Sequence, residues 1–121
     1  MPVNVTVEAG QPVVLTVTGK LSRAEHQQAQ QAVEAEIARA GDISILVLLE
    51  NFTGWEKGAD WGDFSFLAKN DPQISRMAIV GDPQWEASAE AFTLKGLRKV
   101  EIEYFGAGDE KKASDWLMSV V

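Results

Sequence analysis

The segment ISILVLLE, residues 43–50, decides the fold class of this chain. It is an almost unbroken apolar run, rich in β-branched side chains and interrupted by a single serine. Strands of a parallel sheet are covered on both faces, so they read as continuous apolar runs, whereas half-exposed strands alternate. The run is also far shorter than the roughly 20 residues that a membrane-spanning helix needs. We therefore expect a central strand that is covered on both of its faces.

The segments before this strand predict a hairpin followed by a helix. VNVTVEA (3–9) alternates apolar and polar residues, and VVLTVTG (13–19) follows it after a GQP turn. Two such runs separated by turn residues are typical of an antiparallel hairpin. Ser22 begins a capping box with the glutamate three positions later, which predicts a helix that runs to about Arg39 and ends at Gly41.

The segments after the central strand repeat a helix-then-strand pattern. Apolar residues recur at helical spacing in three segments, and two strand-like runs separate them. An Asp-Pro pair stops the first of these helices, and an aspartate can cap the last one. The expected elements are a loop over 51–58, a helix over 59–69, a strand over 74–82, a helix over 84–95, a strand over 100–105 and a final helix capped by Asp109.

This order, ββαβαβαβα, predicts one α/β domain over residues 1–121. A hairpin followed by βα units implies a mixed, mostly parallel sheet with right-handed crossovers. We expect five strands and four helices, with the first strand as an antiparallel edge.

Composition and charge narrow the possible partners. Eleven basic against eighteen acidic residues give a formal net charge of −7, so we expect no nucleic-acid partner and at most peripheral membrane contact. The chain has no cysteine, which excludes disulfides and thiolate sites. The first residues lack the basic and apolar regions of a secretory signal, and we expect a cytoplasmic protein.

Polar candidates for chemistry are few. Glu50 and Asp82 follow two strands that are expected to be neighbours, where they could bind a cation or share a proton. The alternative is that each accepts hydrogen bonds from the helix N-terminus that follows it. His26 is expected to be solvated on the polar side of the first helix, without a catalytic partner. We therefore predict no enzyme activity, no cofactor and no metal site.

The stretch NFTGWEKGADWGDFSF, residues 51–66, concentrates the aromatic residues. Trp61 and Phe64 fit the buried stripe of the predicted helix, whereas Trp55 precedes it and Phe66 points away from that stripe. Exposed aromatics beside the carboxyl edge of a sheet indicate a partner surface or the lip of an apolar pocket. The alternative is that Trp55 and Phe66 fold under the preceding loop.

Four motifs carry a resemblance to a known family. They are WEKGADWGDFSF (55–66), ISRMAIVGD (74–82), the tryptophan of PQWE (83–86) and DEKKASDWL (109–117). Together with the element order, they are similar to SpoIIAA-like proteins, relatives of the STAS domain of anti-sigma factor antagonists. The resemblance covers essentially the whole chain. It implies strands in roughly chain order, a homodimer, and a distant likeness to the CRAL-TRIO lipid-binding fold.

The chain lacks a residue that is functionally important in anti-sigma factor antagonists. Anti-sigma factor antagonists resemble one another in a phosphorylatable serine at the N-terminus of the helix after the third strand. This chain has Lys57, Gly58, Ala59 and Asp60 there. A serine phosphorylation switch is therefore not expected, although Asp60 could mimic a permanent negative charge.

Three functional hypotheses follow. The first is a non-enzymatic, homodimeric binding module that docks a protein partner through residues 52–66. The second is an apolar small molecule or lipid in a pocket beneath the 59–69 helix. The third is an enzyme that uses Glu50 and Asp82. The side chains expected at the pocket are Phe52, Trp55, Trp61, Phe64 and either Met77 or Phe92.

Overall fold

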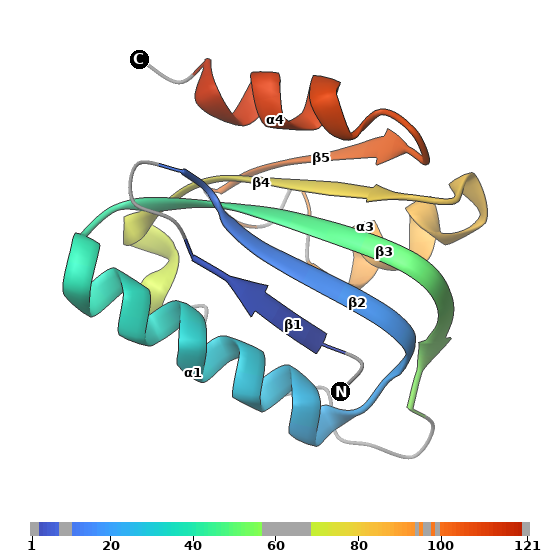
Figure 1. Cartoon of the computed structure of the whole chain (residues 1–121), viewed down its shortest axis with the longest axis horizontal. Helices are drawn as coiled ribbons and strands as arrows, with labels where there is room; N and C mark the ends of the chain where they lie inside the picture. Colours follow the sequence, from blue (N-terminus) through green and yellow to red (C-terminus); the bar gives the residue numbers. More distant parts are fainter. Residues whose placement is uncertain are drawn as a thin grey trace.

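The structure, a computed structural model, is an α/β sandwich built on one five-stranded sheet (Figure 1). It describes residues 3–7, 11–56, 69–93, 95, 98 and 100–119. Helices α1 and α4 lie on opposite sides of the sheet. Among the described residues, none of the helices combines the length and apolarity that crossing a bilayer requires.

The elements follow the predicted order closely. The strands are β1 (Val3–Thr6), β2 (Val13–Leu21), β3 (Ile43–Trp55), β4 (Ile74–Gly81) and β5 (Glu101–Gly106). The helices are α1 (Arg23–Ala40), α3 (Glu86–Phe92) and α4 (Glu110–Met118), with short 3-10 turns η1 (Asp71–Gln73) and η2 (Pro83–Trp85). The predicted helix over 59–69 falls almost wholly outside the described residues.

The sheet has the strand order β1-β2-β3-β4-β5. Strand β1 is antiparallel to β2, with Val3 opposite Val17, and all later pairs are parallel. The mixed, mostly parallel sheet with an antiparallel edge strand is therefore confirmed. Parallel neighbours in chain order need a crossover after each strand, and α1 and α3 lie in the crossovers from β2 to β3 and from β4 to β5.

The start of α1 has Ser22 as its N-cap, as the sequence predicted. Ser22 Oγ accepts a hydrogen bond from the backbone N–H of Glu25 at 3.2 Å, and its hydroxyl donates to the Glu25 carboxylate at 2.5 Å. The helix ends at Gly41, whose φ of 85° is a conformation that residues with a Cβ rarely adopt. Local chemistry thus sets both ends of this helix.

Strand β3 continues to Trp55, so the predicted loop over 51–58 was wrong for its first five residues. The pairing with β2 shifts register around Gly19 and then resumes, with Leu21 opposite Trp55. Asn51 at φ 51° and Gly54 at φ 116° accommodate the irregular backbone. These residue types looked like a turn in the sequence, whereas here they serve bulges inside a long bent strand.

Two predictions about the C-terminal helices also need correction. The helix expected over 84–95 is shorter, because η2 occupies its first turn and α3 ends at Phe92. Thr93 closes α3 by donating its hydroxyl to the Ala89 carbonyl at 2.8 Å. Asp109 precedes α4 but its side chain makes no capping hydrogen bond.

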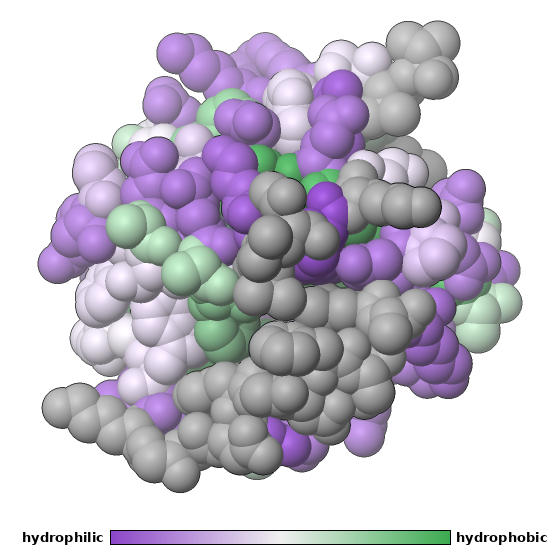
Figure 2. Space-filling view, turned by 180° about the vertical axis from the view of Figure 1, so that it is seen from behind, coloured by the Kyte–Doolittle hydropathy of each residue, from purple (hydrophilic) through white to green (hydrophobic). Residues whose placement is uncertain are grey.

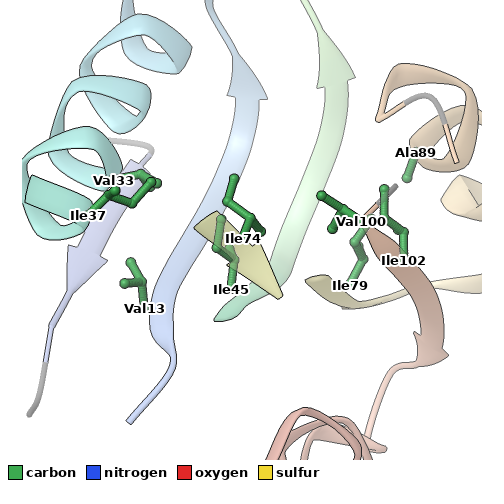
Figure 3. Close-up of a cluster of buried hydrophobic side chains, with 9 residues drawn as sticks. All are labelled: Val13, Val33, Ile37, Ile45, Ile74, Ile79, Ala89, Val100 and Ile102. Atoms are coloured by element: carbon green, nitrogen blue, oxygen red, sulfur yellow. The ribbon is translucent and has the colours of Figure 1, made fainter. Parts of the chain in front are cut away.

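Strand β3 is buried on both faces, as its apolar run predicted. Ile45 is 2% exposed and packs on the side of α1 and α3, whereas Leu46 is 3% exposed and packs on the side of α4. Figure 3 shows the first of these clusters, in which side chains of α1 face those of the strands. Its buried members are Val13, Val33, Ile37, Ile45, Ile74, Ile79, Ala89, Val100 and Ile102.

The ion pair between Arg98 and Asp71 joins segments that are distant in the sequence. Arg98 donates to both carboxylate oxygens of Asp71, at 2.9 and 2.7 Å, and also to the Thr93 carbonyl at 3.0 Å. The Arg98 side chain is only 6% exposed. The pair therefore fixes η1 to the segment that follows α3.

Candidate functional site

The described residues form the wall of a cavity of about 130 Å³ between the sheet and helices α1 and α3, called here the α1/α3 cavity. Its lining is almost wholly apolar. Well-packed interiors contain few voids larger than a water molecule. A space of this size next to the core is therefore a candidate functional site.

The floor of the cavity consists of side chains from three neighbouring parallel strands. In a strand, alternate residues point to the same face. Leu15 of β2, Val47 of β3 and Ile79 of β4 stand opposite one another in the sheet register. The floor residues are Leu15, Val17, Val47, Leu49, Met77 and Ile79.

The walls come from the end of β3 and from the two helices. The bulged end of β3 supplies Phe52 and Trp55. Helix α1 supplies His26 and Ala29, and α3 with the residue that follows it supplies Ala89, Phe92 and Thr93. The extension of β3 past residue 50 therefore places two aromatic rings over the sheet.

The aromatic rings at this end contact one another mostly edge to face. Trp55 lies 5.0 Å from Phe52 and 6.1 Å from Trp85, at interplanar angles of 85° and 78°. Phe92 of α3 lies 5.3 Å from Trp55. Offset and perpendicular pairs of this kind add to the stabilisation from burial. Trp55 is half-buried in this cluster and lines the α1/α3 cavity.

The indole nitrogen of Trp55 is buried, and no described residue accepts a hydrogen bond from it. A buried N–H without an acceptor is unfavourable by about 1–3 kcal/mol. The two near-perpendicular rings beside it are the kind of neighbour with which an N–H can make a weak contact to an aromatic face.

His26 is not solvated, contrary to the prediction. It is half-buried, lines the α1/α3 cavity and meets the ring of Phe92 at 5.2 Å and 71°. Burial, followed by the positive charge of Arg23, lowers the pKa of His26 below its ordinary value of 6.5. The neutral imidazole therefore predominates at pH 7. Its spacing from Ala29, three residues before it on the buried stripe of α1, was the signal in the sequence that could have shown this.

Two of the acidic candidates, Glu50 and Asp82, lie in the part of the chain that the structure describes. Asp82 is exposed and accepts a hydrogen bond from the backbone N–H of Gln84 at 3.0 Å, so it caps η2, which was the alternative prediction. Glu50 is exposed within β3, opposite Thr18, and does not end its strand. Within the described residues, no cluster of three or more His, Cys, Asp or Glu could hold a metal ion. The remaining candidates, Asp60, Trp61, Phe64 and Phe66, lie outside the described residues.

Sequence reasoning missed a tight contact at the end of β4. Tyr104 donates its hydroxyl to the Asp82 carbonyl at 2.7 Å, and burial raises the pKa of Tyr104 to about 12. A Cβ at Gly81 would lie 2.7 Å from that hydroxyl and 3.0 Å from Leu49. Gly81 thus lets Tyr104 and a floor residue of the cavity approach the end of β4 closely.

The comparison with family models identifies the chain. A SpoIIAA-like model matches residues 13–118. The chain belongs to the SpoIIAA-like family. Its fold is generally that of regulatory binding modules rather than of enzymes.

A solved structure agrees with this assignment at the level of the fold. The crystal structure of an uncharacterised protein with a SpoIIAA-like fold from Shewanella loihica is 22% identical to this chain and superposes with a TM-score of 0.68. The match covers 95% of this chain and 91% of that one. No curated protein matches the chain.

Proposed function

We propose that this SpoIIAA-like protein is a non-catalytic module that binds an apolar small molecule in the α1/α3 cavity. The observation that carries this proposal is the cavity itself, about 130 Å³ of space beside the buried core. Phe52, Trp55 and Phe92 line its wall and Met77 lines its floor, and these residue types suit an apolar guest.

The energetics favour occupancy by an apolar molecule. The lining presents apolar surface that a bound apolar molecule would remove from water, at about 25 cal/mol per Å² of surface buried. A ligand that fills the space regains contacts that the lining otherwise lacks. Moving a polar group from water into an apolar site costs free energy unless a hydrogen bond replaces its contacts with water. An almost wholly apolar lining therefore favours an apolar guest.

Native mass spectrometry of the purified protein, compared with its denatured mass, tests the proposal. We expect an added mass that is lost on denaturation. The variant Ala29→Leu places a larger side chain in the cavity wall, and Ala35→Leu makes the same change at an exposed position of α1. The added mass should disappear in the first variant and persist in the second. If it persists equally in both, the molecule does not occupy this cavity.

The competing function is the docking of a protein partner through residues 52–66. We expect a homodimer whether the protein binds a small molecule or docks a partner. In the described part of this region, Phe52 is 7% exposed and Trp55 packs against other rings. Figure 2 shows one face on which the described surface is mainly hydrophilic. These observations favour the cavity, and a bare dimer in the mass spectrum would favour docking instead.

A further inference from the structure

We propose that the α1/α3 cavity selects compact, uncharged molecules of about the size of one aromatic ring, and that it excludes ions and long acyl chains. This inference rests on the proposed function and specifies the chemical class of its ligand. Size, lining and charge each contribute one step.

The volume sets the size of the guest. An engineered core cavity of about 150 Å³ lined by aliphatic and aromatic side chains binds benzene. The α1/α3 cavity, at about 130 Å³, is slightly smaller. A single ring or a short branched chain fills such a space. A long acyl chain has several times as many carbon atoms, so only its end would fit.

The wall favours a flat ring over a flexible chain. Phe52, Trp55 and Phe92 enclose one end of the cavity, and their rings already meet at centroid distances of 5.0 and 5.3 Å. An aromatic guest can add further edge-to-face contacts to this cluster, each of about 0.5–1.5 kcal/mol beyond its buried area. A rigid ring also loses less conformational freedom on binding than a chain does.

The charges exclude ionised guests. None of the described lining residues carries a formal charge at pH 7, because the lowered pKa of His26 keeps its imidazole neutral. The hydroxyl of Thr93 is already donated to the Ala89 carbonyl. A carboxylate or an ammonium group would thus find no counter-charge among the described lining residues, which is strongly unfavourable in an apolar site. The net charge of −7 further disfavours anions.

A set of small probes with related structures tests both parts of the inference. Toluene and benzyl alcohol are neutral molecules with one benzene ring. Benzoate and benzylammonium carry the same ring with a negative or a positive charge, and 1-decanol is a neutral, flexible chain. Binding is followed by the backbone amide NMR shifts of Ala29 and Ala89 in the intact protein at pH 7.5. We expect toluene and benzyl alcohol to shift these amides, with affinities at least about tenfold higher than those of both ions. We also expect both to bind more tightly than decanol, whose flexible chain loses more conformational freedom.

The outcomes separate this inference from the proposed function. Benzoate or benzylammonium binding as tightly as toluene overturns the selection against charge, and tighter binding of decanol at the same amides overturns the size limit. In either case apolar binding itself would stand. If no probe shifts Ala29 and Ala89, both the inference and the proposed function fail. Loss of the toluene shifts at Ala89 in Ala29→Leu, but not in Ala35→Leu, would confirm the location.

Discussion

Filling the α1/α3 cavity should stabilise the protein, and Ala29→Leu is the change that tests this. Ala29 is buried on α1 and lines the cavity. Leucine adds three carbon atoms, and each buried methylene contributes about 0.8 kcal/mol, which gives an upper limit of about 2.4 kcal/mol. Ordering the leucine side chain opposes this by about 0.5–1 kcal/mol. Imperfect fit reduces the gain further, so we expect the free energy of unfolding to rise by about 1 kcal/mol.

Guanidinium chloride and thermal unfolding of the ligand-free protein measure this change. A gain of 1 kcal/mol corresponds to a rise in Tm of about 3–5 °C for a domain of this size. Ala35→Leu, at an exposed position of the same helix, should stay within about 0.5 kcal/mol of wild type.

The opposite sign would refute the reasoning. In a close-packed core, inserting a larger side chain destabilises by about 1–3 kcal/mol. A loss of that size in Ala29→Leu, with Ala35→Leu unchanged, would mean that the space near Ala29 is filled by protein. The ligand proposal would then lose the observation that carries it.

Three further predictions concern the surroundings of the cavity. Because the folded state lowers the pKa of His26 below 6.5, its contribution to stability is complete above pH 6.5 and is lost as the pH falls through the folded pKa. The free energy of unfolding in urea should therefore decrease more between pH 7.5 and 5 in wild type than in His26→Phe. Equal decreases would contradict this. Arg98→Met should lower the free energy of unfolding by about 3 kcal/mol, because it leaves the Asp71 carboxylate without its partner. Lys111→Met, which breaks an exposed pair on α4, should change it by less than about 1 kcal/mol. Similar values for the two variants in chemical denaturation would show that the Arg98 pair is dispensable. Gly81→Ala should destabilise by about 1–3 kcal/mol, since its Cβ would lie 2.7 Å from a tyrosine hydroxyl, and an unchanged Tm would show that this contact relaxes freely.

The element order was predictable because each element has its own local signal. The alternation of residues 3–6 predicted a half-exposed edge strand, and the unbroken run at 43–50 predicted a strand covered on both faces. Ser22 and Gly41 marked the two ends of α1 through their own side-chain and backbone chemistry. Such signals need only a few neighbouring residues, so one sequence contains them.

The irregular end of β3 was not predictable in the same way. Asn51 and Gly54 are turn-forming residues, and local propensity favours a loop there. The pairing of Leu21 with Trp55 overrides that preference and keeps the chain in the sheet beyond two register shifts. This tertiary pairing brings Phe52 and Trp55 over the sheet, where an isolated reading of the segment had left Trp55 free to be exposed.

The sequence by itself determined the α/β class, the edge hairpin, the buried central strand and the aromatic residues available for a site. Only the tertiary structure decided that a cavity lies among them, because a filled core and a pocket use the same apolar residue types. The difference depends on how side chains from β2, β3, β4, α1 and α3 meet across gaps of a few ångströms. The same assembly buried His26 and kept its ring uncharged, since desolvation is a property of the packed fold and not of the residue.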